Sequence, residues 1–450
     1  MPKTLFRETV AGSANLFELH RRVPQDYPFL LQSVAPGPQS GRYDILFAFP
    51  TDALRMSADS KQDFFATLDA AHAENHRAQQ DPQPTPLPFL GGWFLLLGYE
   101  MAGHIEPLLR LPKSPYRLPE ALAVRCPSAV IFDHSRSVIE VVSDNDSALQ
   151  RMKSDVSHLL ATPPATPDSV KSLIETLDEE PAEHFETGVR QILEYLKAGD
   201  VFQVNLSRGW RGTLRANSSY QDIYRQLCQS NPAPFAGLAV WNDTAVISSS
   251  PERLVRVADG IVQTRPIAGT RPRSAVIDED RSLRERLLAS FKERAEHIML
   301  IDLERNDLGR VCEPGSIEVD ELMQIESYTH VHHIVSNVRG RLRAGARHGD
   351  VLRAVFPGGT ITGCPKVRAM QIIAELEGEG RGPYTGAMGY LSDDGRMDTN
   401  ILIRSLVCAG QSFSFRTGAG IVADSIPADE LAETRIKARG LLNALRVVSP

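Results

Sequence analysis

The segment EHFETGVRQILEYLKAGDVFQVNLS, residues 183–207, changes from one periodic pattern to another within a few residues. Its first half places apolar residues at helical spacing, at Phe185, Val189, Ile192, Leu193 and Leu196. Gly199 follows at the position where a helix stops, so the pattern predicts an amphipathic helix over residues 184–198. From residue 201 to residue 207 the period is two, which predicts a strand.

The predicted strand has one polar face inside an apolar region. This face carries Gln203, Asn205 and Ser207, whereas the residues between them are apolar. Polar side chains in apolar surroundings need hydrogen-bond partners. A half-solvated antiparallel strand is the interpretation that this segment alone favours, and a strand that lines a polar site is the alternative.

The chain as a whole has the composition of a globular protein. Of its 450 residues, 42% are hydrophobic and 23% are charged, which argues against disorder, collagen and coiled-coil rods. The length allows two or three compact units or one large intertwined domain. The 56 acidic and 49 basic side chains leave a net charge of −7, far from the basic surplus of proteins that bind nucleic acids. We therefore expect no nucleic-acid partner.

The cysteine count and the lengths of the apolar runs predict the cellular compartment of the protein. The five cysteines never occur as C-x-x-C, and an odd number cannot close into a complete disulfide set. The N-terminus lacks a long apolar core, and the most apolar short stretch, residues 93–97, is far too short to span a membrane. We expect reduced thiols, no membrane segment and a cytoplasmic location.

Composition divides the chain into three regions. Residues 161–182, ATPPATPDSVKSLIETLDEEPA, are rich in proline, threonine and acid, which is typical of an exposed connector. We predict a β-rich N-terminal region over 1–160, a connector over 161–183 and a second region over 184–447. Strands are predicted at 42–50 and within 129–142, and a loop at 76–88.

Two pairs of glutamates carry the clearest chemical signal. Glu293 and Glu296 are three residues apart in FKERAEHIML, as are Glu430 and Glu433 in ADELAET, so each pair shares one face of its predicted helix. If these faces met, the four carboxylates would need a divalent cation, and Mg²⁺ prefers oxygen ligands of this kind. Solvated glutamates on exposed helix faces are the alternative, which the spacing alone favours.

Glycine-rich and basic motifs suggest contacts with an anion. FPGGTITGCPK, residues 356–366, combines a glycine turn and the hydroxyl of Thr360 with a predicted helix start. In RTGAG, Gly418 and Gly420 allow a carboxylate to approach the backbone closely. Arg404, in MDTNILIRSL, offers a guanidinium fork for a carboxylate. A turn, a hairpin glycine or a surface arginine would explain each motif taken alone.

Taken together, the motifs resemble those of the chorismate-utilising enzymes. The strings that carry the resemblance are GDVFQVNLSR, SSSPERL, RPIAGTRPR, KERAEHIMLIDLERNDLGRV, YTHVHHIVSNVRG, FPGGTITGCPKVRAM, RGPYTGAMGY, MDTNILIRS, RTGAGIVADS and ADELAETRIKA. They follow one another in the family's order over residues 185–445. PFLLQS, RYDI and PFLGGWFLLLGYE extend the resemblance more loosely into the N-terminal half.

The resemblance implies an α+β fold of the anthranilate synthase component I type. In this fold two large, mostly antiparallel sheets pack together with helices outside, and the active site lies in a cleft between them. Residues 184–447 would be the chorismate-binding catalytic region. The resemblance also implies Mg²⁺ between the protein and the ring carboxylate, with Glu296 and Glu433 as direct ligands and Glu293 and Glu430 acting through water.

Catalytic and substrate-binding roles also follow from the resemblance. Glu252, in SSSPE, matches the general acid that protonates the departing C4 hydroxyl, and burial or nearby negative charge would keep it protonated. His333 matches a histidine beside the ring, and Thr360 matches a residue that contacts the substrate. The expected substrate contacts further include Gln203, Tyr384, Arg404, the amides of Gly418, Ala419 and Gly420, and Lys437.

Gln203 also indicates the nucleophile. Family members that add water have lysine at this position, because an amine of lowered pKa can deprotonate a water molecule, whereas glutamine cannot. Ammonia is then the expected nucleophile. Because no glutaminase region is recognised in the chain, the resemblance implies a separate glutamine amidotransferase subunit as partner.

Two aminating activities remain open. Component I of aminodeoxychorismate synthases delivers nitrogen to C4 for 4-aminobenzoate and folate synthesis, whereas component I of anthranilate synthases delivers it to C2 and then eliminates pyruvate. The chain length, FPGGTITGCPK and MDTNILIRS resemble the former. Ala268, in PIAGT, replaces the lysine that many aminodeoxychorismate synthases have there as a covalent nucleophile, so we expect a different first nucleophile. A non-catalytic ligand-binding subunit is a third reading, which the complete set of glutamates disfavours.

The N-terminal half contains a candidate regulatory site. Leu31, Gln32 and Ser33 resemble part of the Leu-Leu-Glu-Ser segment with which anthranilate synthases bind inhibitory tryptophan, and Gln32 replaces the glutamate. A neutral amide pairs more weakly with an ammonium group than a carboxylate does, so we expect poor inhibition by tryptophan. Packing of a strand explains the same residues without a ligand.

Overall fold

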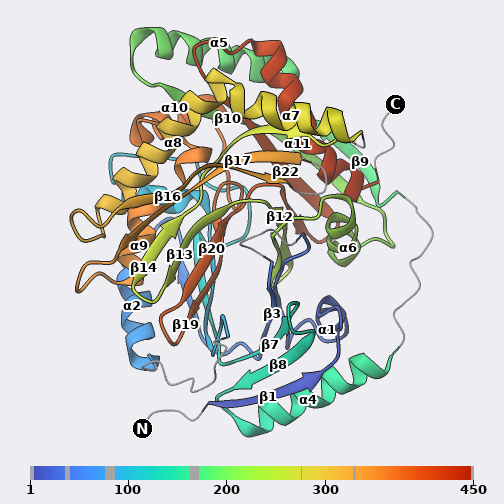
Figure 1. Ribbon diagram of the computed structural model, residues 1–450. Coiled ribbons are helices and arrows are strands. Elements are labelled where there is room, and N and C mark those ends of the chain that lie inside the picture. Colours follow the sequence, from blue (N-terminus) through green and yellow to red (C-terminus); the bar gives the residue numbers. More distant parts are fainter. Residues whose placement is uncertain are drawn as a thin grey trace.

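Two large antiparallel sheets pack against each other at the centre of the protein, and helices surround them (Figure 1). The computed structural model describes residues 5–35, 41–76, 87–162, 172–274, 276–327 and 331–446, except the side chains of residues 270, 272 and 292. The α+β class and the packed pair of sheets that the sequence predicts are confirmed.

The larger sheet joins both halves of the chain. Its twelve strands are, in spatial order, β1 (Phe6–Ala11), β8 (Val138–Ser143), β7 (Ser128–Asp133), β3 (Tyr43–Ala48), β2 (Phe29–Gln32), β11 (Phe235–Trp241), β12 (Thr244–Ser250), β21 (Ser405–Ala409), β22 (Ser412–Ile421), β10 (Gln203–Leu214) and β18 (Gly363–Cys364), with β9 (Ile174–Glu179) also beside β10. The N-terminal and C-terminal halves meet where β2 pairs with β11.

The smaller sheet has the same mixed origin. Its ten strands are β15 (Ile267–Pro272), β17 (Val331–Arg341), β14 (Ile261–Thr264), β13 (Arg253–Ala258), β20 (Met397–Ile401), β19 (Ala387–Ser392), β5 (Gly92–Leu97), β6 (Ala121–Cys126) and β4 (Ala53–Met56), with β16 (Glu318–Ser327) beside β17. Here β5, from the N-terminal half, pairs with β19 from the C-terminal half.

Helices cover the outer faces and the ends of the sheets. They are α1 (Phe17–Arg22), α2 (Phe64–Asn75), η1 (Tyr99–Met101), α3 (Ala102–Ile105), α4 (Asp146–Ala161), α5 (Ala182–Ala198), α6 (Tyr220–Ser230), α7 (Ile277–Ala289), α8 (Phe291–Gly309), α9 (His348–Val355), η2 (Gly359–Ile361), α10 (Lys366–Glu377) and α11 (Pro427–Ala444). Figure 1 shows α4 along β1 and β8 at one end of the molecule and α5, α10 and α11 near β10 and β22 at the other.

β5 shows how one strand contributes to two apolar cores. All six of its residues, GWFLLL, are buried, which is typical of a strand covered on both faces. Phe94 and Leu96 enter the interior between the sheets, whereas the odd-numbered residues pack with side chains of α2 and α9 outside. Between the sheets the ring of Phe94 stacks on that of Phe29, with the ring centroids 4.2 Å apart. Aromatic packing therefore joins the two sheets directly.

The helix and the strand predicted within residues 183–207 are both present. α5 ends before Gly199, whose φ of 80° is a left-handed conformation that glycine adopts without strain. β10 follows at Gln203 and pairs with β22, so that Asn205 lies opposite Gly420. The polar face of β10 is therefore placed against the glycine-rich strand β22.

The predicted domain boundary separates regions of the sequence that share both sheets. β9 lies within the range predicted as a connector, whereas residues 163–171 of that range fall outside the described residues. Residues 77–86 of the predicted loop also fall outside them. The division at 161–183 stays a prediction about the sequence, with strands from both sides of it in each sheet.

The remaining expectations about the chain concern thiols and membranes. All five cysteines are free, and Cys126, Cys312 and Cys408 are buried. Within the described ranges, no helix combines the length and the hydrophobicity needed to cross a bilayer.

A buried ion pair joins two strands of the smaller sheet. Arg125 on β6 donates two hydrogen bonds, of 2.6 and 2.7 Å, to Asp393 after β19, and both side chains are almost fully buried. The change Asp393→Ala would leave a buried guanidinium without this carboxylate, so we expect the free energy of unfolding to fall by about 3–5 kcal/mol. Chemical denaturation measures it. The control Glu194→Ala breaks the exposed pair of Glu194 with Lys197 and should cost less than about 1 kcal/mol. Equal losses in the two variants would contradict the prediction.

Candidate active site

Three of the residues expected at the site, Thr360, Arg404 and Lys437, lie near the buried carboxyl group of Glu252. They come from η2, from the loop between β20 and β21 and from α11, which the chain brings together only on folding. All three lie close enough to Glu252 to influence its pKa. The structure therefore gathers the expected acid and these three neighbours at one place.

Glu252 lies in the short loop between β12 and β13 and is 5% exposed. Its backbone is fixed, because its N–H donates to Ser250 Oγ at 3.2 Å and its carbonyl accepts from the N–H of Ile401 at 3.0 Å. Burial raises the pKa of the carboxyl group to about 7, although a neighbouring hydroxyl, a backbone N–H and two cations act in the opposite direction. Such a group can hold a proton near neutral pH, as a general acid must.

Arg404 presents a guanidinium that forms no ion pair with any residue in the described part of the chain. Its φ of 54° is a left-handed conformation, which is rare for a bulky residue and is often found where function imposes strain. Burial lowers the pKa of the guanidinium, whereas Tyr384, Glu433 and Glu252 favour its charged form. A half-buried cation that forms no ion pair with a described residue is suited to a carboxylate from a ligand.

Two glycines of β22 pack closely against Tyr384 and the polar face of β10. A Cβ atom on Gly418 would lie 2.9 Å from the Tyr384 hydroxyl oxygen and 2.7 Å from Asn205 Oδ1. A Cβ atom on Gly420 would lie only 2.3 Å from Gln203 Nε2. A Cβ atom at Gly418 would also lie 2.7 Å from the backbone carbonyl oxygen of Leu206, so glycine is required there, whereas at Gly420 the flexible end of Gln203 would have to move.

Lys437 and Ala419 complete this part of the site. Lys437, on α11, donates from Nζ to the carbonyl of Gly418 at 2.9 Å and pairs with Glu433 at 2.6 Å. Ala419 is fully buried in the apolar cluster that β10 and β22 form with α5 and α10, so its side chain faces away from the polar side. The ammonium group of Lys437 is thus held at the end of the glycine-rich strand.

His333 and Ala268 lie on the paired strands β17 and β15. His333 is 8% exposed, and burial lowers its pKa to about 4, so its ring is neutral at pH 7. Ala268 is also buried and lies opposite Ile334. The neighbouring Ile267 donates its backbone N–H to Glu252. A methyl group therefore occupies the position next to the acid where many aminodeoxychorismate synthases are expected to have lysine.

Thr360 and Lys366, both in the motif FPGGTITGCPK, make different contacts. Thr360, in η2, lies beside Glu252, and its buried Oγ1 has no well-aligned hydrogen-bond partner among the residues described. Lys366 at the start of α10 instead pairs with the buried Asp307 of α8 at 2.5 Å. Glu304, one turn earlier on α8, has its pKa raised to about 8 by burial and by Asp307. The lysine therefore anchors the motif to α8, and the threonine hydroxyl stays available to a ligand.

The four glutamates predicted to hold a metal ion lie on the expected helices, α8 and α11. Across the described ranges, however, no group of three or more His, Cys, Asp or Glu side chains lies close enough to hold a metal ion. Glu293 pairs with Arg271 at 3.1 Å, Glu433 pairs with Lys437, and Glu430 accepts a hydrogen bond from Ser425 at 2.7 Å. The carboxylate chemistry suits Mg²⁺, but protein cations compensate part of the negative charge in this structure. Magnesium binding stays a prediction.

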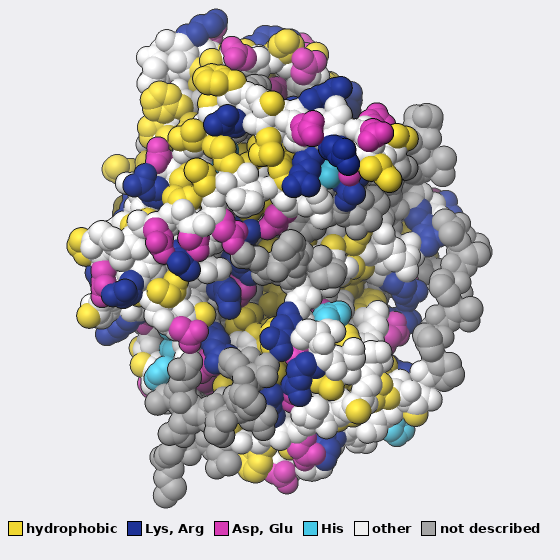
Figure 2. Space-filling model, in the orientation of Figure 1, with side chains coloured by type: hydrophobic (Ala, Val, Ile, Leu, Met, Phe, Trp, Pro, Cys, Tyr) yellow, Lys and Arg dark blue, Asp and Glu magenta, His cyan; other side chains and the backbone are white. Residues whose placement is uncertain are grey.

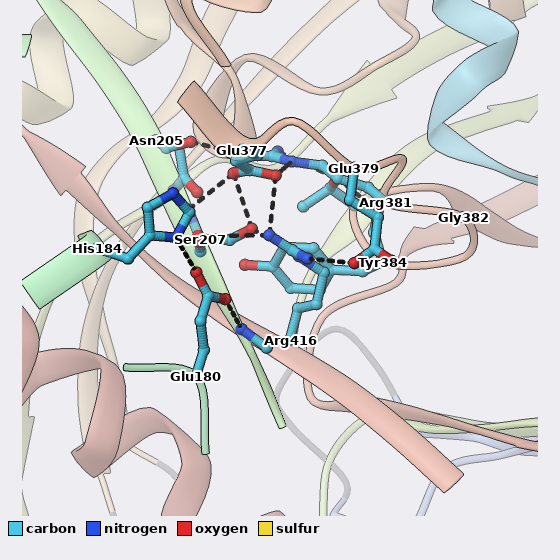
Figure 3. A network of polar contacts seen from close by, with 12 residues as sticks. Glu180, His184, Asn205, Ser207, Glu377, Glu379, Arg381, Gly382, Tyr384 and Arg416 are labelled. Carbon is cyan, nitrogen blue, oxygen red and sulfur yellow. Dashed lines mark hydrogen bonds and ion pairs between the residues drawn. The ribbon is translucent and has the colours of Figure 1, made fainter. Parts of the chain in front are cut away.

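A network that the sequence analysis did not predict holds the glycine-rich strand and the Tyr384 turn in place (Figure 3). Its centre is the buried carboxylate of Glu377, which accepts two hydrogen bonds from Arg381 and one from Arg416, at 2.6–3.2 Å. The N–H and the hydroxyl of Ser207 also donate to it, each at 2.8 Å. Burial would raise the pKa of Glu377, but the two arginines hold it below its ordinary value.

Arg381 extends this network to the Tyr384 turn. It donates to the carbonyls of Asn205 at 2.7 Å and Ile361 at 3.2 Å, and its guanidinium lies over the rings of Tyr99 and Tyr384. The sequence indicated that Ser207 needs a partner, because this residue lies on the polar face of its strand. Its partner Glu377 is 170 residues away in the chain, so no local pattern could identify it.

A cavity of about 760 Å³ lies between β2, β3 and β11 of the larger sheet and β13, β19 and β20 of the smaller one. Glu252 is not among its lining residues, whereas the predicted tryptophan-site residues Leu31, Gln32 and Ser33 are. Figure 2 shows basic side chains around a hollow near the middle of the face drawn. Several arginines line the cavity, at Arg42, Arg253, Arg256 and Arg396.

The amide of Gln32 is already bound by the protein. Its Nε2 donates to Asp44 Oδ2 at 3.0 Å, and its Oε1 accepts from the Tyr224 hydroxyl at 2.8 Å. The other oxygen of Asp44 accepts from the N–H of Ser33 and lies 2.9 Å from His134 Nε2, a hydrogen bond that raises the pKa of His134. Whether an amino acid binds in this cavity stays a prediction.

Comparison with known proteins gives consistent matches over nearly the whole chain. The sequence pattern of the chorismate binding enzymes matches residues 28–443. An anthranilate synthase component I-like protein of Synechocystis sp. is 40% identical over 92% of this chain and 86% of its own length. An aminodeoxychorismate synthase component 1 of Klebsiella aerogenes is 38% identical over 94% of both chains, and an anthranilate synthase component 1 of Streptomyces coelicolor is 39% identical over 94% of this chain and 84% of its own.

Solved structures agree with these matches. Anthranilate synthase component I from Streptococcus pneumoniae superposes with a TM-score of 0.78 at 34% identity, over 89% of this chain and 92% of that one. The menaquinone-specific isochorismate synthase of Escherichia coli superposes with a TM-score of 0.74 over 99% of this chain and 95% of that one. At 18% identity the second comparison concerns the fold alone.

The burial of Glu252 predicts the pH dependence of turnover. A general acid works only while protonated, so with a pKa of about 7 we expect kcat to fall as the pH rises above 7, approaching tenfold per pH unit. Glu252→Gln cannot donate that proton, so kcat should drop by about 10²–10⁴ and the remaining rate should lose this alkaline limb. Steady-state rates between pH 5.5 and pH 9 measure both effects. Glu183→Gln, on the exposed face of α5, should keep the wild-type profile, and an unchanged profile in Glu252→Gln would exclude the role.

Proposed function

The chain belongs to the family of chorismate binding enzymes, and from this premise we propose that it is component I of an aminodeoxychorismate synthase. In this proposal it aminates chorismate to 4-amino-4-deoxychorismate with ammonia from a separate glutaminase subunit. The product would serve 4-aminobenzoate and folate synthesis, and the enzyme would work in the cytoplasm.

The observation that carries the proposal is the pairing of a buried acid with a nearby unpaired cation. Glu252 can hold a proton, and Arg404 forms no ion pair with a described residue. Chorismate has a hydroxyl group that must leave and carboxylates that need cations, so this pair matches both parts of the substrate. The hydroxyl of Thr360 and the glycine-rich strand at Gly418 support the same placement.

Gln203 supports ammonia as the nucleophile. The position where water-adding relatives are expected to have lysine holds an amide, which cannot deprotonate water. The nearby Lys437 is bound to Glu433 and to the carbonyl of Gly418, so it is not a free base. Without a base to deprotonate water, ammonia is favoured, because neutral ammonia is the stronger nucleophile and needs no deprotonation before it attacks.

The proposed reaction balances without an added oxidant or reductant. The C4–O bond of chorismate breaks and a C4–N bond forms, so chorismate and ammonia give the amine and one water. Glu252 gives its proton to the departing hydroxyl, and the proton that ammonia loses on becoming an amine restores the acid. Tyr384, Arg404 and the backbone near Gly418 would hold the carboxylates during this exchange.

Anthranilate formation is the second candidate, and Ala268 is the observation that favours it. Alanine cannot form the covalent adduct expected of lysine at this position, and several relatives are named anthranilate synthase. In that reaction ammonia adds at C2, and water and pyruvate leave. The two candidates share the acid, the carboxylate contacts and the ammonia donor, and they differ in the carbon attacked.

We include Mg²⁺ in the proposal, with Glu296 and Glu433 as direct ligands and Glu293 and Glu430 acting through water. The all-carboxylate donor set suits this ion, which would neutralise the ring carboxylate. Because the four groups are not gathered in this structure, no step above is assigned to the metal.

The product distinguishes the candidates. Purified protein is incubated with chorismate, MgCl₂ and ammonium chloride, and the products are separated by mass and fluorescence. We expect an amine of chorismate that yields 4-aminobenzoate only after an aminodeoxychorismate lyase is added. A parallel reaction without Mg²⁺ should be slower, and one with glutamine in place of ammonium should give no product without the glutaminase subunit.

Other products would exclude the proposal in different ways. Anthranilate without any lyase would establish the second candidate. Isochorismate would exclude ammonia as the only nucleophile. Binding of chorismate without turnover in any of these mixtures would indicate a regulatory subunit.

The cavity around Gln32 gives a separate prediction. Because its amide is bound to Asp44 and Tyr224, it has little capacity to bind the ammonium group of an amino acid. We expect weak inhibition of turnover by tryptophan in the wild-type protein. Gln32→Glu would add a carboxylate and should strengthen the inhibition. Inhibition curves for the two proteins test this, and potent inhibition of the wild type at low tryptophan would contradict it.

A further inference from the structure

The polar face of β10 is only partly satisfied by the protein. Ser207 has its hydrogen bonds to Glu377 and Arg416, as Figure 3 shows. Farther along the same face, Asn205 Oδ1 and Gln203 Oε1 are buried, and neither has a hydrogen-bond partner in the part of the chain that the structure describes. Asn205 itself is 9% exposed. Two buried acceptors without donors are costly, unless a ligand supplies the donors.

Both amides lie where a ligand is expected. They pack against the glycines of β22, with Asn205 Oδ1 near Gly418 and Gln203 Nε2 near Gly420. The Tyr384 hydroxyl also reaches Gly418, so Asn205 lies beside a proposed substrate contact. The two amide oxygens that lack donors among the described residues therefore lie in the proposed active site.

Chorismate cannot satisfy these acceptors. Its two carboxylates and its ether oxygen only accept hydrogen bonds at neutral pH, and carboxylate oxygens facing amide oxygens would repel them. Its one hydroxyl is needed at Glu252 in the proposed reaction. A second ligand that is rich in N–H groups would satisfy both acceptors.

We propose that Asn205 Oδ1, with Gln203 Oε1 beside it, forms the site that receives ammonia, an inference that rests on the proposed amination. Residues two apart on a strand point the same way with Cα atoms about 6.6 Å apart. Ammonia has three N–H groups, so it can donate one hydrogen bond of about 2.9 Å to each amide oxygen and keep its lone pair for attack.

Neutral amides suit this task better than carboxylates. A carboxylate would hold the nitrogen as ammonium, because an ionic hydrogen bond favours the protonated form, and ammonium has no lone pair to attack with. An amide oxygen accepts an N–H without adding charge. The site thus concentrates the nucleophile and leaves it reactive.

The dependence of turnover on ammonium tests the proposal. Initial rates are measured with ammonium chloride as the variable substrate, at one pH and constant ionic strength, and separately with chorismate as the variable substrate. Asn205→Leu has a side chain of similar size without the acceptor. Loss of one hydrogen bond should raise the KM for ammonium about three- to tenfold and leave the KM for chorismate unchanged.

A conservative variant and a matched control separate binding from folding. Asn205→Asp keeps an acceptor and adds charge, so its KM for ammonium should equal or fall below that of the wild type, while kcat falls because the nitrogen is held protonated. Asn337→Leu removes another buried asparagine, on β17 in the smaller sheet, whose Oδ1 also lacks a partner among the described residues. It should leave both KM values unchanged.

Two kinds of failure are distinguishable. If the wild type forms no amine, the proposed function fails and the ammonia site fails with it. If the wild type aminates chorismate but Asn205→Leu keeps its KM for ammonium, or raises only the KM for chorismate, the ammonia site alone is excluded.

Discussion

The buried carboxylate of Glu377 is the contact on which the geometry of the site depends. Two arginines and Ser207 share it, and each of these groups belongs to a different segment: β10, β22 and the turn after α10. Taking three charges out of water is favourable only when their hydrogen bonds are complete, so these segments have little freedom to shift. The glycine-rich strand is positioned directly by this constraint through Arg416, and the Tyr384 ring is positioned through the guanidinium of Arg381 that lies over it.

Burial determines the protonation of Glu252 in another part of the site. The loop between β12 and β13 carries Glu252 into the interior between the sheets, where desolvation raises the pKa of its carboxyl group toward neutrality. Arg404 experiences the same desolvation, but it keeps a fixed charge and has no partner among the described residues. One fold thus provides a neutral proton donor and an unpaired cation a short distance apart, without placing them in an ion pair.

The sequence predicted individual elements, whereas the roles of the individual site residues stay predictions. The helix before Gly199, the polar face of β10 and the helical spacing of both glutamate pairs are local patterns, and each is present. Whether Glu293, Glu296, Glu430 and Glu433 gather around a metal ion depends on how α8 and α11 pack, which local spacing does not determine, and it stays a prediction. The Glu377 network was missed, since its members are neighbours only in space.

The amino-acid sequence by itself determined the periods, caps and motifs, and with them the fold class and the family resemblance, because these depend on residues close together in the chain. Only the tertiary structure decided which polar groups find partners. Ser207 and Asn205 lie on the same strand face and look alike in the sequence, yet Ser207 is bound by Glu377, whereas Asn205 Oδ1 has no hydrogen-bond partner among the residues described. Hydrogen-bond satisfaction depends on distances across the sheets, and those distances are set only when the distant segments pack together.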